Sequence, residues 1–350
     1  MERTYILEPG TTLRKAGHCL AVTRGPETIA EIPLEGLQQL TLVGYTSLTG
    51  AVLDVLIRRR IETVLLSPHG GFRARLMVDE HKHVERRRGQ YLRLSDPTVA
   101  LNTARVIVQG KLRNSARFLA RRGSRHGLNE VNRLAAQIKG LADLVERQED
   151  METVRGVEGR ASNLYFEAFP QLLRVPGFDF RGRNRRPPLD PVNALLSFVY
   201  TLLTLEVLTS IKVVGLDPYL GSLHTVEYGR PSLACDLVEE WRSFLGDRLV
   251  LALINRKVIQ PDDFVYRPTV CPDAVDEEEL KERRPVEMKP KIGRAFLEAY
   301  EKWMTTRITL PGSREKTHYR GLVRRQVRQF GHYLVGDRER YQPFLWSEVT

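Results

Sequence analysis

The spacing of hydrophobic residues changes once along this chain, close to Val78, and the change limits the folds that the chain can adopt. Before this point, short apolar stretches such as residues 4–7 and 37–43 alternate with glycine and proline turns, a pattern typical of β-strands. After it, apolar residues recur at intervals of three and four, as amphipathic helices require. The sequence therefore predicts an α+β protein, with a small N-terminal β domain containing one helix, followed by a larger, mainly α-helical domain.

Composition places the boundaries of these parts. We predict a β domain over 1–80, a charged linker over 81–95, a helical domain over 96–335 and a C-terminal tail over 336–350. In the β domain we expect one helix at 48–59 and strands at 4–7, 18–23, 28–32, 37–43, 61–66 and 72–78. The segment 273–290, rich in charge and flanked by proline, is expected to be a mobile loop.

The charge balance indicates the kind of partner. With 54 Lys and Arg against 43 Asp and Glu, the net charge is +11, which favours a polyanion such as nucleic acid. We find no apolar run of about 18 residues and an N-terminus too polar for a signal peptide, so we expect a cytoplasmic protein without a membrane anchor. The three cysteines, Cys19, Cys235 and Cys271, are far apart, which predicts buried, reduced thiols.

A histidine and several carboxylates gather between residues 215 and 240. The stretch 215–224 (GLDPYLGSLH) breaks any helix before His224, and Ser232 is placed to cap the helix that carries Asp236 and Glu239 on one face. Oxygen donors with a single imidazole favour Mg²⁺ or Mn²⁺ over structural zinc. A solvated acidic surface would produce the same pattern, so this motif alone leaves both interpretations open.

A further carboxylate, Glu158, lies between two glycines in residues 156–166 (GVEGRASNLYF), where backbone and ligand can approach closely. The alternative is an exposed glutamate at a helix start. Near His224, helix geometry pairs Asp236 with both Glu239 and Glu240, so side-chain chemistry does not choose the ligand among these three.

A basic loop precedes a long apolar helix at residues 180–198 (FRGRNRRPPLDPVNALLSF). A guanidinium group can donate two parallel hydrogen bonds to phosphate oxygens, so we assign four loop arginines and one near Glu158 to the backbone of a bound nucleic acid: Arg181, Arg183, Arg185, Arg186 and Arg160. A solvated basic loop is the alternative. The roles of Arg121, Arg122 and the stretch holding Lys111, Arg113 and Arg117 stay open.

Together these motifs resemble the CRISPR-associated integrase family, the metal-dependent nuclease and integrase subunit of spacer acquisition. The glutamate segment, the proline-rich loop, the GLxPxxGxLH segment and the DLxE helix follow one another in the family's order, and the resemblance reaches to about residue 330. It implies that Glu158, His224 and Glu239 bind Mg²⁺ or Mn²⁺ and act in catalysis, and that Asp236 assists. His224 would ligate or orient the metal, or pass protons.

The resemblance also implies the reaction and the partners. The expected activity is attack on a DNA phosphodiester, by water in nicking or by a 3′-hydroxyl in strand transfer that inserts spacers into a CRISPR repeat array. The expected partners are branched and double-stranded DNA, a second copy of the chain joined through the β domains, and a small ferredoxin-like CRISPR adaptation protein in a heterohexamer-type complex. A DNA-binding scaffold without activity and a metal-dependent RNA nuclease remain as alternatives.

Overall fold

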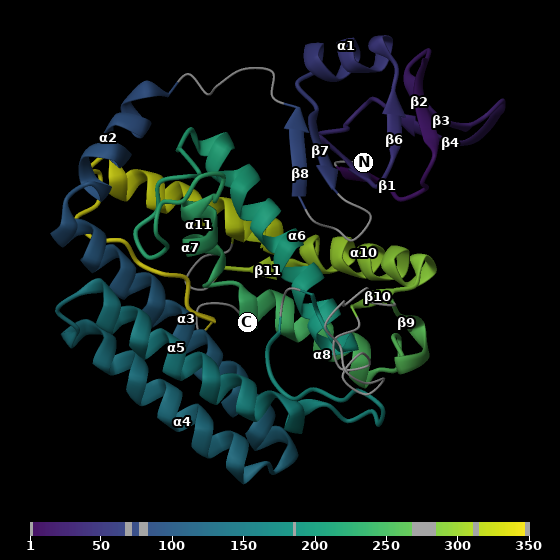
Figure 1. The fold of residues 1–350 in the computed structure, drawn as a ribbon. Coiled ribbons are helices and arrows are strands. Elements are labelled where there is room, and N and C mark those ends of the chain that lie inside the picture. The colour runs from purple at the N-terminus through teal and green to yellow at the C-terminus, as the bar shows by residue number, and fades with distance from the viewer. Residues whose placement is uncertain are drawn as a thin grey trace, which may run out of the picture. The chain divides into compact units, whose positions relative to one another are not determined.

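The computed structural model describes residues 3–66, 72–76, 83–184, 187–267, 285–310 and 315–346 (Figure 1). The chain divides into two compact units, Met1–Glu80 and His81–Thr350. The first consists mainly of strands and the second mainly of helices, which confirms the predicted fold class.

The N-terminal unit contains two four-stranded sheets, with strand orders β1-β5-β7-β8 and β4-β3-β2-β6. In the first, β5 pairs in parallel with β1 and β7, and in the second β3 pairs antiparallel with β2 and β4. The elements are β1 Arg3–Ile6, β2 Thr11–Ala16, β3 Cys19–Arg24, β4 Glu27–Pro33, β5 Gln39–Val43, β6 Thr46–Leu48, α1 Gly50–Arg58, β7 Glu62–Leu66 and β8 Phe72–Leu76. We predicted one helix and six of these strands, but not β2 and β6.

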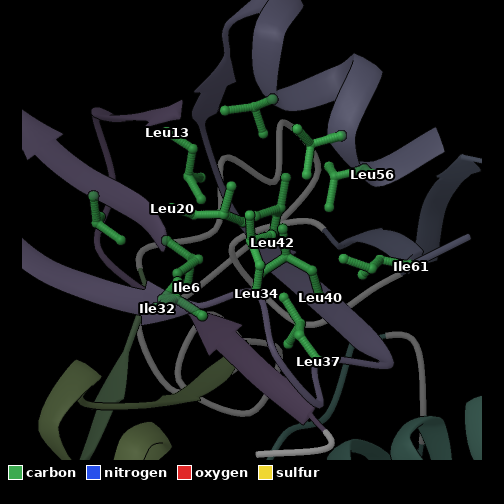
Figure 2. Packing of buried hydrophobic residues seen from close by; sticks show 13 residues of the cluster. Ile6, Leu13, Leu20, Ile32, Leu34, Leu37, Leu40, Leu42, Leu56 and Ile61 are labelled. Carbon is green, nitrogen blue, oxygen red and sulfur yellow. The ribbon is translucent and has the colours of Figure 1, made fainter. Parts of the chain in front are cut away.

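The core of this unit forms where the two sheets and α1 meet. Leu13 and Leu20 come from one sheet, Leu40 and Leu42 from the other and Leu56 from α1, and all five are 1% exposed or less (Figure 2). Burying side chains of this size stabilises the fold by about 1.5–3 kcal/mol each. The core is therefore built from residues of nearly every element in the unit.

The second unit begins with a helix and contains helices of very different length. Its elements are α2 Val84–Leu94, α3 Pro97–His126, α4 Asn129–Leu144, η1 Val145–Arg147, α5 Met151–Ala168, η2 Phe169–Leu172, α6 Pro191–Val214, α7 Ser232–Val238, the π-helix η3 Arg242–Asp247, α8 Arg248–Asn255, η4 Pro261–Asp263, β9 Phe264–Tyr266, β10 Val286–Met288, α10 Pro290–Met304, β11 Arg307–Thr309, β12 Lys316–His318 and α11 Tyr319–Leu334. The helices α3, α4 and α5 pack side by side (Figure 1). These three helices position much of the site described below.

Local sequence signals explain where the long helices begin and end. Asp96 caps α3 by accepting a hydrogen bond from the Thr98 amide at 2.8 Å, Pro97 occupies the first turn, and Gly127 ends the helix at φ +67°. Asp190 caps α6 in the same way by accepting from the Asn193 amide at 2.8 Å. These caps fix which residues of α3 and α6 face the interior.

The helix α6 corrects one prediction. We expected no segment long and apolar enough to cross a membrane, but α6 meets that criterion by length and composition. Its most apolar window is 72% buried inside the protein, and its Glu206 pairs with Arg320 of α11 at 3.0 Å, both side chains being buried. The helix therefore serves as a core helix of this unit.

Three predicted segments differ from the structure. Most of the charged linker 81–95 is the helix α2, whose buried Gln90 donates hydrogen bonds to the carbonyls of Asp217 and Leu220 at 2.8 and 2.9 Å. In the predicted tail 336–350, the described residues 336–346 are packed against the protein, because Tyr341, Phe344 and Trp346 are buried, and residues 347–350 lie outside the described residues. In the predicted loop 273–290, residues 273–284 lie outside the described residues, but Val286–Met288 form β10, paired with β9.

The cysteines are free where the structure describes them. Cys19 and Cys235 are half-buried thiols rather than fully buried ones, and Cys271 lies outside the described residues. Burial raises the pKa of the Cys235 thiol, so this group is a protonated thiol at neutral pH.

Candidate metal and DNA site

The carboxylates of Glu158 and Glu239 converge on one cation. The ammonium of Lys111, from the middle of α3, contacts Oε1 of Glu158 on α5 and lies 2.8 Å from Oε2 of Glu239 at the end of α7. Arg242 approaches the other oxygen of Glu239 at 3.1 Å. Two carboxylates that the sequence places 81 residues apart are thus brought to a single point by three helices.

Burial and charge act in opposite directions on these groups. The side chain of Glu239 is 4% exposed, which alone would raise its pKa, but the charges of Arg242 and Lys111 outweigh burial and lower the pKa to about 2. For Lys111, burial works against the charged form, yet the charges of Glu239 and Glu158 raise its pKa. Glu239 and Lys111 are therefore both charged at neutral pH.

Asp236 folds the loop that carries His224. Its buried carboxylate accepts hydrogen bonds from the backbone amides of Ser222, Leu223 and His224 at 2.6, 2.9 and 2.9 Å. The same group pairs with Nδ1 of His224 at 2.6 Å. Where the chain is described, Nε2 has no hydrogen-bond partner, so this nitrogen is left to act on a ligand.

The GLDPYLGSLH segment needs its second glycine for a physical reason. A Cβ on Gly221 would lie 2.5 Å from Oδ2 of Asp236 and 2.8 Å from the backbone of Ser232, closer than atoms approach. In contrast, a Cβ on Gly156 or Gly159 would meet no protein atom within 4 Å, so packing within the chain does not require these glycines, and close approach of a ligand beside Glu158 stays a prediction. Ser232 also does not cap α7, because its hydroxyl donates to the Thr225 carbonyl at 2.9 Å.

The histidine loop is tied to the helix that carries Glu158. Arg155, one turn before Glu158 on α5, donates to the Leu223 carbonyl at 3.0 and 2.6 Å. Gln90 of α2 holds the beginning of the same loop through the carbonyls of Asp217 and Leu220. The position of His224 relative to Glu158 is therefore set by side-chain to backbone bonds.

Glu240 has a structural role, which bears on the choice of metal ligand among Asp236, Glu239 and Glu240. Its carboxylate accepts from the Tyr341 hydroxyl at 2.5 Å and from the Phe344 amide at 2.8 Å, both in the C-terminal segment. Asp236 is engaged by the loop amides and by His224. Of the three acidic side chains of this segment, only Glu239 shares a cation with Glu158.

The cluster opens into a cleft of about 270 Å³, lined by residues that include Lys111, Glu158, Asn163 and Arg242. At its side, Asp247 accepts hydrogen bonds from the hydroxyls of Tyr165 and Tyr200 at 2.5 and 2.6 Å. Burial raises the pKa of Asp247 to about 6. The cleft thus combines ionised groups with a carboxyl that titrates close to neutral pH.

The arginines assigned to DNA from the sequence fall into different environments. Arg181 is 82% exposed and lies 3.4 Å from Asp179, and Arg160 is exposed on α5. Arg183 donates to Oδ1 of Asn193 at 2.6 Å and to the Ser197 hydroxyl at 3.0 Å, and it also lines the cleft. Arg185 and Arg186 lie outside the described residues. Arg183 therefore helps to hold the loop in place, and its contact with phosphate stays a prediction.

The donor set fits a divalent cation at one point. Among the described residues, no three His, Cys, Asp or Glu side chains form a ready metal site. However, Glu158 and Glu239 already share a positive charge, the Lys111 ammonium, and carboxylate oxygens are the ligands that Mg²⁺ and Mn²⁺ prefer. The two carboxylates can therefore hold a divalent cation if the ammonium moves aside.

Lys111, Arg242 and Arg155 belong to the site, and sequence reasoning did not assign them to it. A signal for Lys111 was present: it lies three residues after Val108 and seven after Ala104, both buried, so it occupies a core-facing position of α3. A lysine in such a position needs an acidic partner. No comparable pattern marks Arg155 or Arg242.

Related sequences point to one class of protein. The chain is 38% identical over 342 residues to the CRISPR-associated endonuclease Cas1 3 of Thermus thermophilus, covering 97% of this chain and 96% of that protein. It is 33% identical over 348 residues to the CRISPR-associated endonuclease Cas1 1 of Chlorobaculum tepidum, covering 98% and 97%. A Cas4 exonuclease/Cas1 endonuclease fusion of Geobacter sulfurreducens is 35% identical over 349 residues, 97% of this chain but 60% of the fusion.

Solved structures share the fold. A CAS1 protein from Thermotoga maritima superposes with a TM-score of 0.77 at 24% identity, covering 99% of both chains. A casposase bound to integration product gives a TM-score of 0.78 at 21% identity, covering 98% of this chain and 93% of that one. Fold and sequence together define a CRISPR-associated protein. More narrowly, the family model of CRISPR associated protein Cas1 matches residues 4–282, and the chain belongs to this family, as its motifs indicated.

Proposed function

We propose that this chain is a Mg²⁺- or Mn²⁺-dependent DNA endonuclease and integrase, which inserts DNA fragments into a CRISPR repeat array in the cytoplasm. The observation that carries the proposal is the convergence of Glu158 and Glu239 on one cation position. The loop that holds His224 is tied to the helix that carries Glu158. The names of the related endonucleases and of the casposase bound to integration product support the same chemistry.

In this proposal, each residue has a separate task. Glu158 and Glu239 hold the cation, which when bound would neutralise charge at phosphorus and lower the pKa of the attacking hydroxyl. His224 donates Nδ1–H to Asp236, the tautomer that the hydrogen bond favours, so Nε2 is an acceptor. That nitrogen can take a proton from the attacking group or join the ligands, and Asp236 is the residue that positions it.

Lys111 and Arg242 balance the charge. Without a divalent cation, their two positive charges match the two negative charges of Glu158 and Glu239. The ammonium of Lys111 and a divalent cation cannot occupy the same point, so Lys111 has to turn toward the cleft when the cation binds. There, a phosphate oxygen of DNA can accept a hydrogen bond from the ammonium. Binding of the cation and binding of DNA should therefore reinforce each other.

The proposed partners extend beyond DNA. A Cas6-RT-Cas1–Cas2 complex contains a chain that superposes with a TM-score of 0.81 at 20% identity, covering 98% of this chain and 36% of that one. We propose a homodimer joined through the β units and a heterohexamer-type assembly with the small ferredoxin-like adaptation protein. Light scattering of the two purified proteins, alone and mixed, tests this; unchanged masses on mixing would contradict it.

The activity is tested by nicking and strand transfer on a branched DNA that contains a repeat sequence. We expect joined product with Mn²⁺ or Mg²⁺ and none with EDTA, while DNA binding in EDTA persists. Binding without any reaction on branched DNA would favour the inactive scaffold instead. Faster cleavage of a matched RNA than of DNA would favour the RNA nuclease.

A further inference from the structure

A strongly basic hollow lies beside the C-terminal half of α3. It has a volume of about 700 Å³, and its lining includes Arg117, Arg121, Arg122, Arg125, Arg248 and Trp346. A smaller hollow of about 200 Å³ shares Arg122 and Arg125 and adds Arg174 and Arg256. The two hollows form one surface, which we call the α3 arginine surface, and none of its residues was assigned to DNA in the sequence analysis.

The positive charge of this surface is not compensated. No carboxylate lines either hollow, and within the described ranges none of its seven arginines forms an ion pair with Asp or Glu. Elsewhere in the unit, arginines do find such partners, as Arg133 does with Glu130 and Arg320 with Glu206. Burial and the nearby charges of Arg248 and Arg125 lower the pKa of Arg122. The surface therefore stores repulsion that an anionic ligand would relieve.

Aromatic rings hold several of these guanidinium groups in place. Arg121 and Arg248 lie 5.1 and 4.7 Å from the ring centre of Trp346, and Arg122 lies 5.8 Å from that of Phe118. When the flat face of a guanidinium group lies against an aromatic ring, its N–H edge stays available to a phosphate. Trp346 belongs to the C-terminal segment, which is fixed to α3 because its amide donates to Asn114 at 2.8 Å.

The surface continues from the catalytic cleft. Lys111 and Arg122 are eleven residues apart on α3, which is about three turns or 16 Å, so they lie on nearly the same side of the helix. Tyr165, which lines the cleft, has its ring centre 6.1 Å from that of Phe118, the ring on which Arg122 lies. A strand that leaves the cleft along α3 would therefore pass the arginines.

We propose that the α3 arginine surface binds the phosphodiester backbone of DNA and guides the DNA to the cleft at Lys111 and Glu158. The inference rests on the proposed function, because it assumes that DNA is the substrate of that cleft. The exposed arginines Arg117, Arg121 and Arg125 follow one another at intervals of four residues, about 6 Å along the helix, so they can contact phosphates in succession.

The test is DNA binding in EDTA as a function of salt, measured by fluorescence anisotropy on the labelled branched DNA. The variant Arg121→Gln/Arg125→Gln should lower the slope of log affinity against log salt by about two and weaken binding roughly ten- to hundredfold at 0.1 M salt. The control Lys139→Gln/Arg147→Gln removes two exposed charges on α4 and η1, outside both hollows, and should change the slope much less. Unchanged melting temperatures verify the fold of both variants.

A charge-preserving variant separates phosphate contact from packing against Trp346. Arg121→Lys/Arg125→Lys should keep most of the salt slope, because the point charges remain. The inference would be overturned if Arg121→Gln/Arg125→Gln kept the salt slope of the wild type, or if the control variant lost as much of that slope. Either result would leave the proposed function intact. Absence of any DNA binding by the wild type would instead contradict the proposed function.

Discussion

Glu239 and Glu240 are neighbours in the sequence, yet they face two regions of different chemistry. Among the described residues, Glu239 forms its ion pairs with two positive side chains, Lys111 and Arg242. Glu240 meets hydrogen-bond donors of the C-terminal segment, the Tyr341 hydroxyl and the Phe344 amide. Ionic partners can be exchanged for a metal ion without unfolding the chain, whereas directed hydrogen bonds hold the fold itself. The kind of partner, rather than burial, therefore separates a candidate ligand from a structural carboxylate.

The largest effect that this comparison predicts is on catalysis. Glu239→Gln removes a charged ligand at the point shared with Glu158. The rate of strand transfer on branched DNA with Mn²⁺ should therefore fall by roughly a thousandfold or more, because several kcal/mol of stabilisation at phosphorus are lost. Binding of the same DNA in EDTA should change little. The matched control is Glu227→Gln, an exposed glutamate that pairs with Arg230. Comparable losses in both variants would break the comparison.

For the neighbouring residue, Glu240, we expect a loss of stability rather than a loss of catalysis. Glu240→Ala leaves the Tyr341 hydroxyl and the Phe344 amide without their acceptor, so the free energy of unfolding should fall by about 3 kcal/mol. Urea unfolding followed by tryptophan fluorescence reports on this region, because all three tryptophans, Trp241, Trp303 and Trp346, lie in the helical unit. A loss below about 0.5 kcal/mol would mean that the segment does not depend on Glu240.

Asp236 combines a structural role with a role at the site, because its hydrogen bonds both shape the loop and orient His224. Asp236→Asn should lower strand transfer by about ten- to hundredfold, the usual cost of losing the partner that orients an active-site histidine. The decrease should appear in the rate of strand transfer while binding of the same DNA in EDTA changes little, because Asp236 orients His224 and does not itself contact DNA. An equal loss of DNA binding would indicate a purely structural role.

A further prediction concerns the dependence of stability on pH. The pKa of Asp247 is raised to about 6 in the folded protein from an ordinary 3.8, so the folded state binds this proton more tightly, and the contribution to stability is lost as pH rises from about 4 to about 6. The stability advantage of the wild type over Asp247→Asn should therefore shrink by roughly 3 kcal/mol between pH 4 and pH 7. A difference that stays constant with pH would contradict this.

Much of the fold follows from local signals, and the missing parts lack them. Strands such as β5 and β7 consist mainly of Leu, Val and Thr, residues that favour strands, and lie between turn residues. In contrast, β2 buries Leu13 but exposes Arg14 and Lys15, which hides its alternation. The helix caps Asp96 and Asp190 follow from the sequence. The packing of residues after 336 does not, because Phe344 and Trp346 follow no period and their partners are more than 100 residues away.

The residues of the candidate site also differ in how far the sequence predicts them. The ligand candidates Glu158, His224 and Glu239 came from motifs with fixed spacing, and the loop geometry explains why Gly221 and Asp236 accompany them. The choice of Glu239 over Glu240 required the family resemblance, since the two residues differ only in the direction of their side chains. The hydrogen bonds that Arg183 makes to Asn193 and Ser197 were not predicted, because a count of arginines does not reveal which of them already have partners in the protein.

The measurement that tests the central claim most directly is a titration with Mn²⁺ followed by electron paramagnetic resonance, on the wild type, Glu239→Gln and Glu240→Gln in the presence of DNA. Glutamine at 240 keeps an acceptor for the C-terminal segment, so that variant should stay folded and bind Mn²⁺ nearly as the wild type does. Glu239→Gln should bind Mn²⁺ at least about a hundredfold more weakly, because a charged ligand is lost. Wild-type affinity in Glu239→Gln, or loss of Mn²⁺ in a folded Glu240→Gln, would contradict the account.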